Sequence, residues 1–335
     1  FVVDKLADYH SIICSWHASG EKLRDTFARQ AIPMVWDYAE ANPFSNSSGC
    51  FDNMLEWVEK SVREMPAGIM GRVMQHNASD KNDLQQVVVS TDPPYYDNIG
   101  YANLSDYFYI WMRKVLRGVE SKLFSTLQTP KQQELVAEPD RFEGSKASAK
   151  SFFEQGMSET CKQLYRCAST DVPMTIYYAF KQNDTDLDGI ASSGWETMLN
   201  AIVSAGFSIT GTWPVRTELS IRPRANRSNA LASSIVLVCR KRDATAATCT
   251  RKNFLRELKK ELESSLAHLQ ASNIAPVDMA QSAIGPGISV YSRYAAVLES
   301  DGSPMTVRSA LKLINQALDD YFHGQGENLD AESRF

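Results

Sequence analysis

A short apolar segment that ends in two prolines sets the strongest limit on how this chain can fold. Residues 86–90 read Gln-Val-Val-Val-Ser, and Thr91-Asp92-Pro93-Pro94 follows at once. Consecutive β-branched residues are typical of a strand that is buried on both faces of a parallel sheet. Proline has a fixed φ and no N–H to donate, so the strand has to end before Pro93 and the chain has to turn there. The sequence therefore predicts a parallel strand whose carboxyl end carries Asp92.

Helix-like and strand-like segments alternate on both sides of this strand, which predicts an α/β fold. We expect helices within residues 4–40 and over 51–62, 105–119, 151–167, 195–205, 253–269, 277–282 and 303–321. We expect further strands over 71–74, 174–180, 207–212 and 233–240, the last two as an antiparallel pair.

The order of these segments predicts a Rossmann-like sheet with helical N- and C-terminal additions. The expected parts are a helical segment 1–65, a core 66–245 and a helical segment 246–335. The polar residues 121–150 are too many for an ordinary connection, so we expect this insertion in the core to be functional or mobile.

Composition and charge exclude several classes of protein. The chain contains no run of about 18 apolar residues and no signal-peptide pattern, which indicates a cytoplasmic protein without membrane segments. Six cysteines without a Cys-x-x-Cys pair predict neither a disulfide framework nor a zinc site, and we expect no bound metal. The net charge of −5 does not exclude nucleic acid, since a local stripe of lysine and arginine is sufficient for phosphate contacts.

Asp92-Pro93-Pro94-Tyr95 is the most specific motif in the chain, because it follows an apolar strand and precedes an aromatic helix. The tetrapeptide resembles the catalytic motif of amino-methyltransferases that act on adenine N6 or cytosine N4. Residues 92–109, together with 29–34 and 285–294, resemble a narrower group of large prokaryotic adenine-specific DNA methylases, often encoded near phage-defence genes. The resemblance implies a class I methyltransferase fold, S-adenosyl-L-methionine as cofactor, DNA as substrate and other defence-system proteins as further partners.

The motif suits the chemistry of an aromatic amino group, whose nitrogen is a poor nucleophile because its lone pair is delocalised into the ring. A carboxylate and a carbonyl that each accept one amino hydrogen favour a pyramidal nitrogen with a directed lone pair. Asp92 is the expected carboxylate and Pro93 supplies the carbonyl, while Pro93 and Pro94 fix the backbone before the base arrives. We expect Tyr95 to stack on a flipped base through its ring, without a role for its hydroxyl.

A cofactor site in such a fold needs a glycine-rich loop at a strand end. Residues 42–49 resemble the family's loop weakly, since they contain one glycine and lack its leading aspartate. The resemblance implies that the cofactor loop lies upstream of Phe1, so that residues 1–335 alone would be catalytically incomplete. Asn77, in a turn before the catalytic strand, and Asp92 are the expected cofactor contacts, with a plain turn as the alternative for Asn77.

Nucleic-acid contacts are expected from aromatic and basic side chains near the motif. Tyr96 and Tyr101 are candidate stacking residues, and ordinary packing is the alternative for both. A loop between the last two strands, at the sheet edge that carries Asp92, holds four candidate phosphate contacts: Arg216, Arg222, Arg224 and Arg227. A solvated charged turn is the alternative for this cluster.

The sequence therefore predicts methylation of adenine N6 in DNA by in-line transfer to a flipped base. Cytosine N4 remains an alternative, because the tetrapeptide excludes it only weakly. RNA or protein amide methylation also remains open, although related families more often begin the motif with Asn than with Asp. An alternative of a different class is a non-catalytic DNA-binding or assembly module of a defence system.

Overall fold

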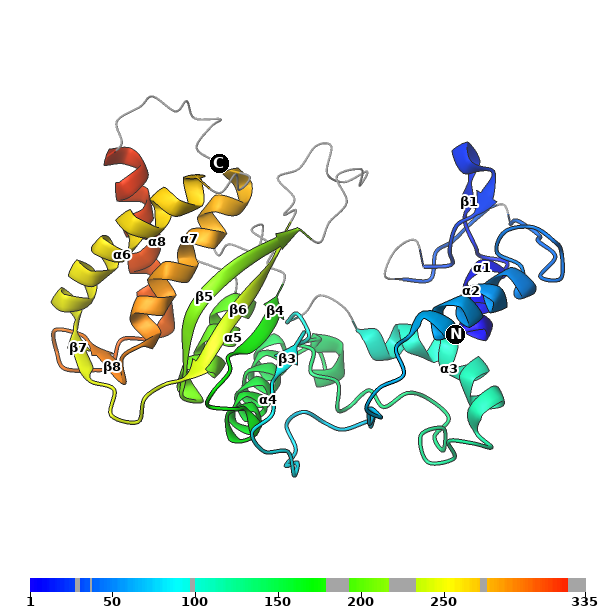
Figure 1. The fold of residues 1–335 in the computed structure, drawn as a ribbon, viewed down its shortest axis with the longest axis horizontal. Coiled ribbons are helices and arrows are strands. Elements are labelled where there is room, and N and C mark those ends of the chain that lie inside the picture. The colour runs from blue at the N-terminus through cyan, green and yellow to red at the C-terminus, as the bar shows by residue number, and fades with distance from the viewer. Residues whose placement is uncertain are drawn as a thin grey trace. The chain divides into compact units, whose positions relative to one another are not determined.

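The computed structural model describes residues 1–27, 31–36, 38–96, 100–178, 193–216, 233–271 and 276–324. The chain divides into two compact units, whose elements are labelled in Figure 1. The first unit comprises Phe1–Asn77 and Ile99–Glu134, and the second comprises Ala78–Asn98 and Leu135–Phe335.

The first unit contains, among its described residues, the α-helices α1 (Val2–Tyr9), α2 (Phe51–Glu64) and α3 (Tyr101–Leu116). α1 contacts both other helices. The Tyr107 hydroxyl on α3 donates to the carbonyl oxygen of Ala7 over 2.7 Å, and Phe27 packs edge-on against the Tyr107 ring. The predicted helices 51–62 and 105–119 are thus confirmed, with α3 beginning at Tyr101 rather than at residue 105.

The prediction of helices across residues 4–40 is correct only for α1. The described chain after α1 forms turns and a short hairpin of β1 (Trp16–His17) and β2 (Lys22–Leu23), joined by the 3-10 helix η1 (Ala18–Gly20). Buried Thr26 fixes this arrangement, because its N–H and hydroxyl donate to the carboxylate and the carbonyl of Asp8. The Trp36 side chain is 95% exposed, so apolar residues at helical spacing do not meet a core here.

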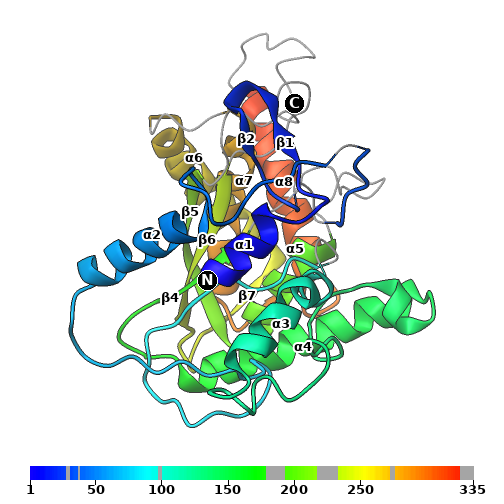
Figure 2. The same cartoon turned by 90° about the vertical axis from the view of Figure 1, so that its right-hand side faces the viewer.

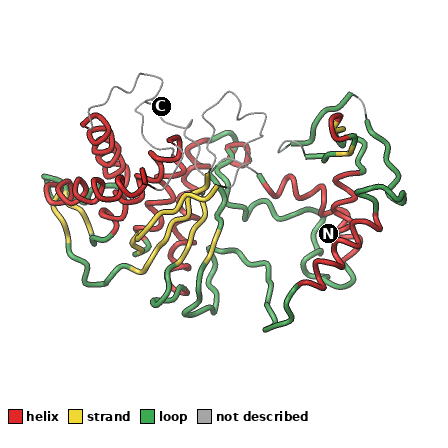
Figure 3. The backbone as a smooth tube through the Cα atoms, turned by 45° about the horizontal axis from the view of Figure 1, so that its top comes forward, coloured by secondary structure: helices red, strands yellow, loops and turns green. Residues whose placement is uncertain are grey.

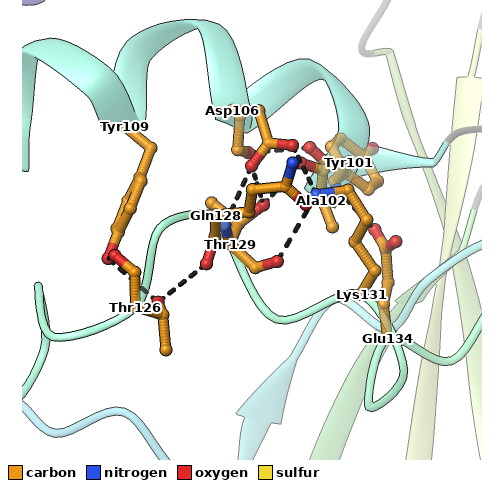
Figure 4. A network of polar contacts seen from close by, with 10 residues as sticks. Tyr101, Ala102, Asp106, Tyr109, Thr126, Gln128, Thr129, Lys131 and Glu134 are labelled. Atoms are coloured by element: carbon orange, nitrogen blue, oxygen red, sulfur yellow. Dashed lines mark hydrogen bonds and ion pairs between the residues drawn. The ribbon is translucent and has the colours of Figure 1, made fainter.

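The polar segment after α3 is held against that helix by hydrogen bonds (Figure 4). The Thr129 N–H donates to the Asp106 carboxylate over 2.8 Å, and Lys131 forms an ion pair with the same carboxylate. The Glu134 carboxylate accepts the Ala102 N–H in the first turn of α3 over 3.0 Å. We call residues 124–134 the strap. The strap belongs to the packing of the first unit, which accounts for the first part of the polar segment 121–150.

The second unit is built on a mixed four-stranded sheet in the order β3-β4-β6-β5. Its strands are β3 (Ser90–Thr91), β4 (Met174–Tyr178), β5 (Phe207–Arg216) and β6 (Ser233–Lys241). β3 and β4 are parallel, and β6 runs antiparallel to both β4 and β5. The chain therefore has an α/β fold, and the predicted antiparallel pair is confirmed.

β3 is shorter and more exposed than the sequence predicts. Its regular pairing is confined to Ser90 and Thr91, although Val87 forms an isolated parallel bridge with Ala168. β3 lies at an edge of the described sheet, and Val88 is largely exposed. The strand predicted over residues 71–74 is absent, since these described residues form no regular structure. A run of valines therefore indicates a strand here without placing it in the centre of the sheet.

The two faces of the sheet have different surroundings. Alternate residues of β4, from Met174 to Tyr178, are buried against α4 (Lys146–Cys167) and α5 (Ser193–Ser204), which lie behind the sheet in Figure 1. The opposite face carries Tyr177 and Trp213, which are 39% and 66% exposed. Both residues pair with Val236 of β6, so they lie in one row across three strands. We call the face of the sheet that carries this row the open face.

Helices and two short strands follow the sheet (Figure 2). These elements are β7 (Thr248–Thr250), α6 (Arg251–Ala271), α7 (Pro276–Ser292), β8 (Ala296–Leu298) and α8 (Val307–Gly324). The sequence does not predict β7 and β8, which pair in parallel. The helices contact one another and share one buried core with the sheet, beside which they are drawn in Figure 3. The helices predicted over 253–269 and 303–321 are confirmed, the latter beginning at Val307.

α7 continues through Pro286, whereas the sequence predicts a helix over residues 277–282 only. Two glycines let this helix approach its neighbours closely. A Cβ atom at Gly285 would lie 1.7 Å from Oγ1 of Thr212 on β5. A Cβ atom at Gly287 would lie 2.6 Å from Cγ2 of Ile314 on α8. The Gly-Pro-Gly string within residues 285–294 therefore has a packing role.

Candidate active site

The Asp92-Pro93-Pro94-Tyr95 motif begins immediately after β3, at the carboxyl end of the strand. β3 pairs in parallel with β4, which ends at Tyr178, so the carboxyl ends of both strands lie at the same edge of the sheet. Ligands of open α/β sheets bind outside this edge. The predicted position of Asp92 at a carboxyl edge is confirmed.

The Asp92 side chain is exposed and accepts one hydrogen bond. The Tyr95 hydroxyl donates to Oδ1 of Asp92 over 2.9 Å. Within the described part of the chain, Oδ2 of Asp92 has no hydrogen-bond partner and remains open to a ligand. The motif thus presents a carboxylate with one oxygen engaged and one oxygen accessible.

The Tyr95 ring is half-buried and rests on a row of aromatic side chains. It meets the Tyr178 ring edge to face, with centroids 5.2 Å apart and planes at 80°. Tyr178 is buried at the end of β4 and lies in turn against Trp195 in the first turn of α5, with centroids 5.7 Å apart. Tyr178 and Trp195 were not among the predicted site residues, although the end of a predicted strand and the start of a predicted helix are the positions that line such an edge.

Tyr96 packs into the core of the second unit. Its ring meets Phe153 of α4 edge to face at 5.1 Å, and its carbonyl oxygen accepts the Ala137 N–H over 2.8 Å. The backbone φ of Tyr96 is +35°, and a Cβ at Gly194 would lie 2.9 Å from the Tyr96 Cβ. These contacts correspond to the packing alternative for Tyr96 and do not direct its ring to a nucleic acid.

Two further predicted site residues, Tyr101 and Asn77, belong to the first unit. Tyr101 begins α3 with its side chain about half exposed. Asn77 closes the first segment of that unit in a half-buried position. Of the predicted catalytic and cofactor residues, the second unit therefore brings together Asp92, Pro93, Pro94 and Tyr95.

The loop 42–49 caps the N-terminus of α2. The Phe44 N–H donates to Oδ1 of Asn42 over 3.0 Å, and the Phe51 N–H donates to the Pro43 carbonyl over 2.8 Å. The Cys50 sulfur accepts the Asn53 N–H, the position of an N-cap side chain. No strand immediately precedes this loop in the described chain. The loop therefore serves as a helix cap.

The predicted arginine cluster lies almost entirely outside the described residues. Arg222, Arg224 and Arg227 are not described, and of Arg216 only the backbone is placed, at the end of β5. Arg216 pairs with Ser233 at the start of β6, and β6 is antiparallel to β4. Arg216 and Ser233, which flank the undescribed residues, therefore lie at the sheet edge that carries Asp92.

None of the six cysteines offers a nucleophile for an alternative chemistry. All six are buried and unpaired. Burial raises the pKa of the Cys161 thiol to about 12 and also raises the pKa of Cys239, which faces Cys161. Thiols of high pKa are poorly ionised at neutral pH and react slowly. The Asp92 motif is thus the main candidate for chemistry in the described chain.

Comparisons with protein-family models, with characterised proteins and with solved structures found no match to this chain. Across the described residues, no helix combines the length and the apolar composition that crossing a membrane requires.

Proposed function

We propose that this protein belongs to the S-adenosylmethionine-dependent amino-methyltransferases and acts on N6 of adenine in DNA, in the cytoplasm. One observation carries the proposal: Asp92-Pro93-Pro94-Tyr95 stands at the carboxyl end of a parallel strand, with an exposed carboxylate. The motif alone would be weak support, because a rigid turn can have the same sequence. Its place at the ligand-binding edge of an α/β sheet is what favours a site.

The chain's own residues account for the base side of the reaction. Oδ2 of Asp92 can accept one hydrogen of the exocyclic amino group, and the Pro93 carbonyl can accept the other. Two such acceptors favour a pyramidal amino nitrogen, whose lone pair is then available for attack. The prolines fix the backbone, and with it the Pro93 carbonyl, before the base arrives, which lowers the entropic cost of reaching the reactive geometry.

The cofactor side of the reaction is not accounted for by the described residues, because the loop 42–49 serves as a helix cap. S-adenosylmethionine enters the proposal through the motif and the resemblance that it carries. We therefore assign no residue of this chain to the binding of S-adenosylmethionine. The cofactor contacts expected from Asn77 and Asp92 stay predictions.

The decisive experiment is methylation by the full-length gene product. The protein is incubated with methyl-labelled S-adenosylmethionine and duplex DNA, and the DNA is digested to nucleosides and separated. Label in N6-methyl-2′-deoxyadenosine supports the proposal, whereas label in N4-methyl-2′-deoxycytidine would transfer the function to cytosine. An Asp92→Ala variant is the matched control, because label that persists in this variant would show that another site is responsible.

A non-catalytic DNA-binding or assembly module is the second candidate, favoured by the absence of a glycine-rich strand-end loop from the described residues. The same full-length protein distinguishes the two functions. A module of this kind would bind DNA in a gel-shift titration and would transfer no label to it. The enzyme would do both.

A further inference from the structure

The hydrogen bond between Tyr95 and Asp92 is a feature of the site that stacking on a base does not require. The donor is the Tyr95 hydroxyl and the acceptor is Oδ1 of Asp92, at 2.9 Å. The hydroxyl oxygen is the atom of Tyr95 farthest from the backbone, so its position depends on how the whole ring is held. A ring that served only for stacking could equally be phenylalanine.

The Tyr95 ring has a fixed support. Tyr178, against which it packs edge to face, is the last residue of β4, is 3% exposed and lies against the Trp195 ring. Close packing at the start of α5 limits Tyr178 further, since a Cβ at Gly194 would lie 3.0 Å from the Tyr178 hydroxyl oxygen. Buried aromatic contacts of this kind hold a ring in one orientation.

An exposed aspartate without such a partner would turn freely about χ1 and χ2. A hydrogen bond to one carboxylate oxygen restricts both rotations and thereby fixes the direction of the other oxygen. Groups that are fixed before the substrate arrives contribute more to a reaction than groups that must be ordered by it. Hydrogen bonds to a charged acceptor are also stronger than those between neutral groups.

We infer that Tyr95 is a positioning residue: its hydroxyl holds Oδ1 of Asp92, so that Oδ2 is directed at the amino group of the target base. This inference rests on the proposed function, because it assigns Oδ2 to the reacting amino group. It gives Tyr95 two separate tasks, with the ring contacting the base and the hydroxyl acting through Asp92.

The test is Tyr95→Phe in the full-length protein, which keeps the ring and removes the hydroxyl. Three quantities are measured: kcat, the KM for DNA, and the fluorescence of 2-aminopurine placed at the target base as a probe of base flipping. We expect kcat to fall about tenfold, which corresponds to roughly 1.4 kcal/mol, while KM and the flipping signal stay within about twofold. The matched control is Tyr177→Phe, because Tyr177 precedes Tyr178 but lies on the open face.

The possible outcomes separate this inference from the proposed function. Tyr95→Phe with the kcat of the wild type would overturn the positioning role and leave the methyltransferase assignment intact. A parallel loss of kcat, flipping signal and thermal stability would also overturn it, because the hydroxyl would then be a structural group. Wild-type protein without any methylation activity would refute the proposed function itself, before the variant is considered.

Discussion

Replacing Gly285 with alanine tests a tightly packed contact between α7 and β5 of the second unit. The added Cβ would lie 1.7 Å from Oγ1 of Thr212 and 2.6 Å from both its Cβ and its Cγ2. Rotating the Thr212 side chain cannot relieve this overlap, because its Cβ is fixed to the backbone of β5. Either α7 or β5 has to shift.

Two opposing effects determine how much Gly285→Ala changes the free energy of unfolding. Alanine favours the helical conformation of α7 over glycine by about 1 kcal/mol. Overpacking in a well-packed core costs about 1–3 kcal/mol, and an overlap that involves a Cβ atom belongs at the upper end. We expect Gly285→Ala to lower the free energy of unfolding of the second unit by about 2 kcal/mol. For a unit of this size, such a loss lowers Tm by roughly 4–8 °C.

Thermal unfolding of the whole chain, combined with hydrogen exchange of peptides from α7 and β5, measures this effect. Two glycines serve as controls. Gly287→Ala meets only the side chain of Ile314, which can move, so its cost should be smaller. Gly118→Ala meets no atom within 4 Å and should be nearly neutral. A Gly285→Ala variant as stable as the wild type would show that α7 does not lie on β5 as described.

Three further predictions concern the candidate site and the strap. Asp92→Ala in the full-length protein should abolish methyl transfer and leave DNA affinity within a few-fold in a binding titration, because the carboxylate acts on the reacting amino group; retained transfer would exclude the site. Burial alone would raise the pKa of Asp106, but the contacts with Lys131 and Thr129 outweigh burial and lower that pKa. The stability that this carboxylate contributes is therefore present above about pH 4 and is lost as the pH falls further. Hydrogen-exchange protection of the strap should decrease in that acid range, and an Asp106→Asn variant should show weak protection at every pH; equal protection in both proteins would contradict the role of the carboxylate. Calorimetric titration of residues 1–335 with S-adenosylmethionine should give weak binding or none, and a micromolar dissociation constant would mean that a cofactor site has been overlooked.

The sequence predicted correctly those elements whose structure depends mainly on neighbouring residues in the chain. Two prolines after an apolar run end a strand wherever that strand lies, so the position of Asp92 at a strand end followed from residues 86–94 alone. The helices α2 and α3 were predicted within a few residues, because apolar or aromatic side chains recur along one side of each. The antiparallel pair of β5 and β6 was predicted from two successive strand-like segments at the end of the α/β pattern.

The elements that were predicted wrongly are those whose structure depends on tertiary contacts. Residues 4–40 contain apolar side chains at helical spacing, but buried Thr26 bonds to Asp8 and holds the chain in turns. α7 runs through Pro286, which normally ends a helix, because glycines on either side of the proline let it pack against β5 and α8. A single sequence does not show which residues form these contacts.

The two prolines of the motif explain why the role of Tyr95 was harder to foresee than that of Asp92. They restrict the backbone between residues 92 and 95, and the side chains of the two residues that flank them form a hydrogen bond. The restriction that would direct the Pro93 carbonyl toward a base in the proposed reaction also favours the approach of the tyrosine hydroxyl to the carboxylate. From the sequence, Asp92 could be proposed as the carboxylate through its motif, whereas the support that Tyr178 gives to the Tyr95 ring comes from more than eighty residues away in the chain. A motif that is short in sequence thus depends for its geometry on a support supplied by the neighbouring strand.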